Sequence, residues 1–211
     1  MTDPISITVS VLALSLSTVT AWLTLLRRGT VKMTQPTTIF FGPDTPRIPD
    51  EHGLPKVYLK TLLFATAKRG RVIESLHVSL ARNETIQNFN IWVFGDEKLG
   101  RGSGLFVGET GVAANHHFLI PSGATFRFTE GLYQLKVFAR LLGDRKPILL
   151  FTQTLEISSQ IAKQLEKNDT GLYFDWGPDS SRYLTHVDRR PPKPSPEDFL
   201  NFVGLGQHPE K

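Results

Sequence analysis

Residues 125–139 read TFRFTEGLYQLKVFA, and this stretch decides the fold. Two phenylalanines alternate with other residues in its first part, and a Glu-Gly pair then supplies a turn. Apolar residues alternate again in its second part, at Tyr133, Leu135 and Val137. Alternation with a period of two is typical of a strand with one buried face. The stretch therefore predicts two strands, Thr125–Phe128 and Tyr133–Leu141, joined at a tight corner.

This corner resembles one found in immunoglobulin-like β-sandwiches, where a tyrosine hydroxyl bonds back to the main chain just before a late strand. Tyr133 is the tyrosine at the matching position. The resemblance implies a fold class, an antiparallel immunoglobulin-like β-sandwich, and it implies no activity. The Cys-Trp-Cys core of true immunoglobulin domains is absent, because the chain has no cysteine.

Short apolar runs, separated by Gly, Pro and charged turns, continue on both sides of the corner. A short amphipathic helix is expected near 159–167, with Ile161 and Leu165 on one face. Many short strands without intervening helices predict an all-β sandwich over 37–187, followed by a Pro-rich flexible tail, 188–211. The other expected strands are Thr38–Phe41, Val57–Thr66, Val72–Ala81, Asn88–Phe94, Gly104–Val107, His116–Ile120 and Ile148–Ile157.

Composition excludes several classes of protein. With 211 residues, the chain fits one folded domain plus attachments. The 24 Lys and Arg are spread along the sequence among 20 acidic residues, whereas a nucleic-acid-binding protein concentrates its basic residues, so we expect no nucleic acid partner. The absence of cysteine excludes disulfides, thiolate metal sites and a cysteine nucleophile.

Residues 5–26 read ISITVSVLALSLSTVTAWLTLL and include no charged residue. As a helix they would extend roughly 33 Å, enough to cross about 30 Å of hydrocarbon. Trp22 lies near one end, where interfacial aromatic residues are found, and Arg27 and Arg28 end the segment. The sequence therefore predicts a transmembrane helix at 5–26, between a short N-terminal segment (1–4) and a juxtamembrane linker (27–36).

A cleavable signal peptide is the competing explanation for this segment. Signal peptides usually begin with basic residues, and residues 1–4 contain none. Positive charge instead follows the segment, at Arg27, Arg28 and Lys32. By the positive-inside rule, the folded domain would be cytoplasmic and the amino terminus outside. We therefore expect a single-pass membrane protein.

One face of the predicted helix is lined by small residues, a pattern that permits close approach of two transmembrane helices. The same pattern also arises by chance in a helix rich in Ser and Thr. If it reflects packing, the protein self-associates or binds another membrane protein through this face. The face consists of Ser6, Ser10, Ala13, Ser17, Thr20 and Thr24.

The adjacent pair His116-His117 raises the question of a metal or acid–base site. Successive residues on a strand face opposite sides of the sheet, so the two side chains cannot bind one ion without a bulge. A zinc site also needs two or three further ligands, and the other histidines are scattered. We favour one histidine hydrogen-bonded inside the domain and the other in water, with no metal or cofactor.

Three other features have structural explanations as well. The glycines around Arg101 favour bulges over a phosphate loop, because no helix follows them. Asp175 and Asp179 flank an aromatic in FDWGPD, which is more typical of turn capping than of paired catalytic carboxylates. The densest basic group, at 68–71, is a hairpin tip that is small for a polybasic lipid site.

Two classes of function stay open. The sequence favours a non-catalytic, membrane-anchored interaction or scaffold module. The alternative is a membrane-tethered enzyme or ligand-binding domain with a composite His/Arg/Asp site. A single pocket shared by a histidine, the arginine and an aspartate would favour that alternative. The composite site would consist of His116, His117, Arg101, Asp175 and Asp179.

Overall fold

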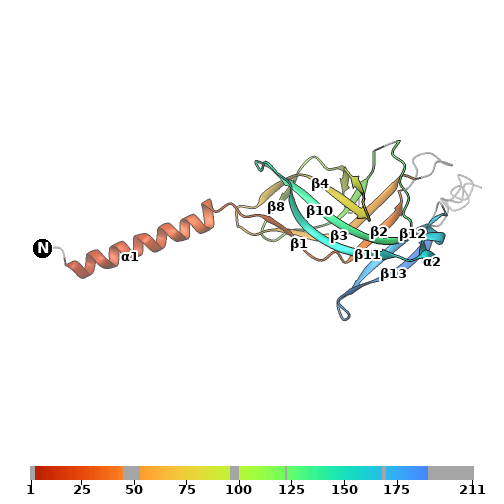
Figure 1. The fold of residues 1–211 in the computed structure, drawn as a ribbon. Helices are drawn as coiled ribbons and strands as arrows, with labels where there is room; N and C mark the ends of the chain where they lie inside the picture. The colour runs from red at the N-terminus through yellow and green to blue at the C-terminus, as the bar shows by residue number, and fades with distance from the viewer. Residues whose placement is uncertain (1–2, 45–52, 96–99, 122, 168–169, 190–211) are drawn as a thin grey trace, which may run out of the picture.

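The computed structural model describes residues 3–44, 53–95, 100–121, 123–167 and 170–189. Within these ranges the chain forms two antiparallel β-sheets packed together. An apolar helix precedes the sheets and projects from one end of the sandwich (Figure 1). The predicted all-β sandwich with one N-terminal helix is therefore confirmed.

The larger sheet has the described strands in the order β13-β12-β2-β3-β9-β6-β7, and β1 also pairs with β3. Its strands are β1 (Val31–Met33), β2 (Thr38–Pro43), β3 (Pro55–Ala65), β6 (Ile91–Phe94), β7 (Gly100–Arg101), β9 (Val112–Leu119), β12 (Thr170–Gly177) and β13 (Arg182–Arg189). The smaller sheet has the order β11-β10-β4-β5, and β8 also pairs with β4. Its strands are β4 (Arg71–Arg82), β5 (Thr85–Phe89), β8 (Leu105–Val107), β10 (Gly131–Leu141) and β11 (Ile148–Ile157).

The hydrophobic core lies between the inner faces of the two sheets, and Phe41 on β2 is central to it. Its side chain is fully buried. The ring stacks on Phe128 at 5.1 Å and meets the rings of Phe174 and Tyr133 edge-on at 5.2 and 6.1 Å. Alternating apolar residues on the paired strands create this core, because every second side chain points inward.

The corner before β10 has the predicted hydrogen bonds. The Tyr133 hydroxyl donates to the Thr129 carbonyl and accepts from the Thr129 N–H, both at 2.9 Å. The tyrosine side chain is buried, and the Arg82 guanidinium lies 5.8 Å from the centre of its ring. The Tyr133 side chain thus fixes this corner. The immunoglobulin-like assignment of the whole domain stays a prediction.

Replacing Tyr133 by phenylalanine is expected to lower the free energy of unfolding by about 1–2 kcal/mol, because both hydrogen bonds at the corner are lost. Urea unfolding of the full chain in mild detergent, followed by tryptophan fluorescence, measures the change. Tyr173→Phe is the matched control, since no hydrogen bond of its hydroxyl is seen in the described part of the chain. An equal loss in both variants would contradict the role of the corner.

Two predicted strands differ in the structure. Thr125–Phe128 is unpaired and crosses the end of the sandwich. It resembles a strand in sequence because Phe126 and Phe128, two residues apart, both pack against the core. Asn88–Phe94 is divided into β5 and β6, which belong to different sheets. The chain changes sheets at this break, so Phe89 and Trp92 both point into the core instead of alternating along one strand.

The structure adds a hairpin, β12 and β13, where the sequence predicts only a turn around Gly177-Pro178-Asp179. The turn exists and joins the two strands. β13 lies at the edge of its sheet and most of its residues are exposed, so its sequence lacks the apolar alternation of a half-buried strand.

The predicted linker, 27–36, differs from the structure because β1 lies within it and pairs with residues 63–65 of β3. The Thr34 N–H extends this pairing with a 2.9 Å bond to the Leu62 carbonyl. β1 has only three residues, one of them charged, and therefore gives no detectable alternation. At the other end, β13 continues to Arg189, past the predicted domain limit. The remainder of the predicted tail, including its acidic–apolar stretch Glu197–Val203, lies outside the described residues.

The N-terminal helix, α1 (Pro4–Ala21), begins where the Asp3 carboxylate caps the Ile5 N–H at 3.1 Å. A π-helical turn, η1 (Trp22–Leu26), continues it. The 21 residues from Pro4 to Thr24 extend about 32 Å and are long and apolar enough to cross a membrane. Six hydroxyls donate to the carbonyl four residues earlier at 2.7–2.9 Å, which reduces the polarity of the helix. They belong to Thr8, Ser10, Ser15, Thr18, Thr20 and Thr24.

Candidate functional site

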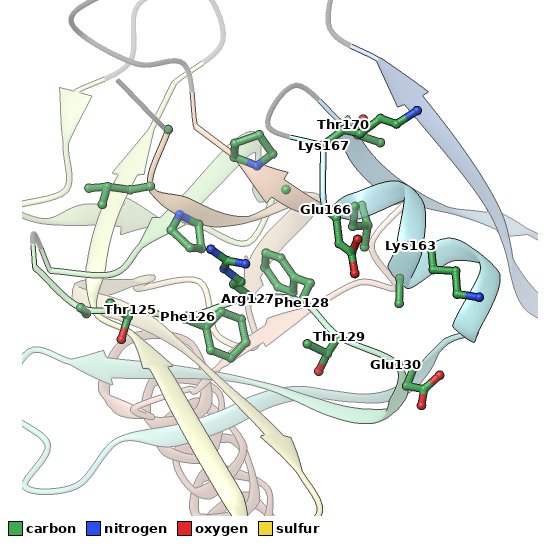
Figure 2. Close-up of a pocket in the computed structure, with 18 of the residues that line it drawn as sticks. Thr125, Phe126, Arg127, Phe128, Thr129, Glu130, Lys163, Glu166, Lys167 and Thr170 are labelled. Atoms are coloured by element: carbon green, nitrogen blue, oxygen red, sulfur yellow. The ribbon is translucent and has the colours of Figure 1, made fainter. Parts of the chain in front are cut away.

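A groove of about 840 Å³ opens at the end of the sandwich that lies away from α1. Figure 2 shows residues 125–130 on one side of it and the helical segment with Lys163 and Glu166 on the other. That helix is α2 (Ser159–Leu165). Residues 42–43 and 53–55, together with Thr170, complete the lining. Clefts of roughly 300–1,000 Å³ are typical of ligand-binding sites.

The first wall of the groove is continuous with the core. Phe128 stacks on Phe41, and Phe126 meets Phe89 edge-on at 5.6 Å between ring centres. Because the phenylalanines point inward, the alternate residue Arg127 is exposed at the rim. Close packing of these rings gives the groove a rigid apolar floor.

The second wall is α2, which begins where the Ser158 hydroxyl accepts a 3.4 Å hydrogen bond from the Ile161 N–H. Ile161 and Leu165 are partly buried and pack against the core, and Leu165 also lines the groove. The predicted amphipathic pair therefore lies over the sandwich. Ala162, between them, lets the groove approach the helix backbone.

The rim of the groove carries charges of both signs, and all of these side chains are exposed. The described lining contains neither a histidine nor a cysteine, and its only acidic residues are exposed. An apolar floor with a mixed-charge rim is the composition of a binding surface. The charged lining residues are Arg127, Lys163, Lys167, Glu130 and Glu166.

The two adjacent histidines lie on opposite faces of β9. His116 is 1% exposed and faces the core, where its Nδ1 accepts a 3.2 Å hydrogen bond from the Trp92 indole N–H. His117 faces the outer side, with its ring 4.9 Å from that of Tyr58. A single ion cannot be shared by two side chains that the strand directs to opposite faces.

The structure does not bring the composite site together. Arg101 and His117 each lie opposite Val93, so two strand spacings separate them. Asp175 on β12 is five strand spacings from Arg101, roughly 24 Å at about 4.8 Å per strand. Asp179 lies in the turn after β12, beside Ser180. Residues this dispersed cannot act on one substrate atom.

An arrangement that sequence reasoning missed is a row of rings across the outer face of the larger sheet. One row of paired residues across β9, β3, β2, β12 and β13 consists of aromatic residues and histidines, namely His117, Tyr58, Phe40, Tyr173 and His186. Within the row, the ring centres of Phe40 and Tyr173 are 4.7 Å apart, and those of Tyr173 and His186 are 5.0 Å apart. His186 Nδ1 also lies 3.1 Å from the Asp175 carboxylate, whose other oxygen accepts from the Thr38 hydroxyl at 2.9 Å. Asp175 thus has structural partners.

The described part of the chain contains no group of three or more His, Asp or Glu side chains arranged to hold an ion. On α1, the predicted small-residue face keeps its side chains on the outside of an exposed helix. Three of its hydroxyls, those of Ser10, Thr20 and Thr24, bond to the helix backbone. No protein-family model, curated protein or solved structure matches the chain.

Proposed function

We propose that the chain is a single-pass, non-catalytic membrane protein whose β-sandwich serves as an interaction module. One observation carries the proposal: α1 has no buried residue. Ile5, Leu14 and Leu16 are each 70% exposed, and the domain covers none of them. An apolar surface of this extent is unfavourable in water, so a lipid bilayer is its natural environment.

The sandwich is proposed to lie on the cytoplasmic side of the membrane. Arg27 and Arg28 follow the helix directly and are exposed, whereas the described residues before it contribute only the acidic Asp3. Positively charged residues next to a transmembrane helix are retained in the cytoplasm. Retention of the helix, rather than its removal as a signal peptide, is part of the same proposal.

Two surfaces are available for protein partners. Within the membrane, the small-residue face of α1 allows a second helix to approach closely. Outside it, the groove offers an apolar floor and a charged rim. Because none of the composite His/Arg/Asp residues lines the groove, the groove supports ligand or peptide binding better than it supports catalysis.

Disulfide cross-linking tests the helix interface. Because the chain has no native cysteine, each variant carries only the introduced thiol. Ser10→Cys and Ser17→Cys lie on the small-residue face, and Ser15→Cys lies on the opposite face and is the matched control. In native membranes we expect oxidation to link the first two variants into a disulfide-bonded homodimer, and to leave the control unlinked. Equal cross-linking at all three positions would contradict association through this face.

A further inference from the structure

The end of the sandwich where α1 enters has a composition unlike the rest of the molecule. This basic end comprises residues 27–32, 66–71, 108–111 and 142–147, which contain eight Lys or Arg and two acidic residues. Its net charge is therefore +6, while the whole chain has a net charge of +4, so the remainder carries −2. Basic residues that are spread along the sequence are gathered in space.

Direct contacts join the four segments of the basic end. The Arg71 guanidinium donates to the Gly29 carbonyl at 3.0 Å and to the Asp144 carboxylate at 2.8 Å. The Thr66 N–H donates to the Thr30 carbonyl at 2.9 Å. Segment 108–111 is attached by a 2.9 Å bond from the Ala65 N–H, next to segment 66–71, to the Gly108 carbonyl. Arg71 is 14% exposed in this network and acts as a structural tie.

The basic end lies next to the end of the apolar helix (Figure 1). η1 finishes at Leu26, and only Arg27 and Arg28 separate it from Gly29, which is in close contact with Ala67. Three residues reach at most about 11 Å when fully extended. Electrostatic attraction to a charged membrane surface falls off over about 8 Å at physiological ionic strength, so Arg27 and Arg28, the first two residues after the helix, lie within its range.

Two large apolar side chains are exposed beside these charges, although water is an unfavourable environment for them. Phe106 is 60% and Leu142 is 63% exposed. They flank the same residue, since Phe106 lies opposite Val72 and the Leu142 N–H donates to the Val72 carbonyl at 2.9 Å. Apolar residues surrounded by Lys and Arg are the composition of surfaces that insert shallowly at the headgroup level.

We propose that the basic end docks on anionic phospholipid headgroups of the membrane that α1 crosses, with Phe106 and Leu142 inserted between them. The inference rests on the proposed anchoring by α1. Its exposed cations are Arg27, Arg28, Lys32, Lys68, Arg69, Arg145 and Lys146. Docking holds the sandwich upright on the bilayer, and it directs the groove at the opposite end away from the membrane.

Fluorescence quenching of the full chain tests this orientation. A single cysteine at Leu142, labelled with an environment-sensitive fluorophore, reports on the basic end, and one at Ile86 on β5, which is 67% exposed, reports on the sandwich away from it. The chain is reconstituted in vesicles of phosphatidylcholine with roughly one-third phosphatidylserine, and a lipid carrying a headgroup nitroxide is the quencher. Lys68→Glu/Arg69→Glu removes charge from the basic end, and Lys163→Glu/Lys167→Glu is the matched reversal at the groove.

We expect quenching at position 142 to be at least about twofold stronger than at position 86, because headgroup contact is confined to the basic end. The difference should shrink in Lys68→Glu/Arg69→Glu and in pure phosphatidylcholine, and persist in Lys163→Glu/Lys167→Glu. Equal quenching at both positions, in chains that resist alkaline carbonate, overturns the docking alone. Unchanged quenching in pure phosphatidylcholine overturns the requirement for anionic lipid. Extraction by carbonate overturns docking and membrane anchoring together.

Discussion

Arginine at both Leu12 and Leu16 is expected to abolish stable membrane integration of the chain. Both side chains lie in the middle of α1 and are 64% and 70% exposed, so the domain offers them no partner. An arginine at the centre of a transmembrane helix costs about 2.5–3.5 kcal/mol on insertion scales. Two arginines therefore cost about 5–7 kcal/mol, which shifts the insertion equilibrium by roughly four to five orders of magnitude.

Alkaline carbonate extraction of membranes from expressing cells measures this effect. The wild-type chain should stay in the membrane pellet and Leu12→Arg/Leu16→Arg should appear in the soluble or aggregated fractions. Leu12→Ile/Leu16→Ile keeps the helix apolar and is the control that should remain in the pellet. If the arginine variant were as resistant to carbonate as the control, α1 would not be what holds the chain in the membrane.

The second large effect is expected in the core. Phe41→Ala should lower the free energy of unfolding by about 3–5 kcal/mol, because it leaves a cavity where the ring is fully buried. The lost ring contacts Phe128, Phe174 and Tyr133, which belong to three different segments of the chain. Since domains are typically stable by only about 5–15 kcal/mol, the variant is expected to be close to unfolding at physiological temperature.

Urea unfolding in mild detergent, followed by tryptophan fluorescence, compares this variant with wild type. Ile86→Ala removes an apolar side chain that is 67% exposed and should change the free energy of unfolding by less than about 0.5 kcal/mol. A similar small change for Phe41→Ala would mean that the two sheets are not packed around this ring.

Much of the fold was accessible from local patterns. Strands such as β3 and β10 have clear alternation, because each buries one face against the opposite sheet. The corner at Tyr133 was predictable because its hydrogen-bond partner is only four residues away. α1 was predictable because an uninterrupted apolar run needs no knowledge of the rest of the chain.

The errors arise where local pattern and pairing differ. Residues 125–128 alternate because Phe126 and Phe128 close the end of the core, and alternation alone cannot distinguish that role from a paired strand. β13 is the opposite case, since it is paired on one side only and mostly exposed. Without a buried face, it leaves no apolar period to detect.

The groove and the basic end could not be predicted from local sequence patterns, because each is assembled from segments that are distant in the sequence. The groove combines residues 124–130 with α2 and the start of β3. The basic end combines the tip at Lys68 and Arg69 with Arg145 and Lys146, some 80 residues later in the sequence. Three basic residues on one hairpin resemble an ordinary solvated turn, whereas eight around the end of an apolar helix support the proposed membrane-facing surface.

Membrane anchoring by a retained α1 is the central claim, and intact-mass spectrometry of the protein from carbonate-washed membranes tests it most directly. The claim predicts a membrane-resident chain that includes residues 1–26, with a mass of 23.6 kDa for the 211 residues. A soluble chain, or one shortened by removal of the apolar segment, would show that this segment is a signal peptide and would contradict the claim.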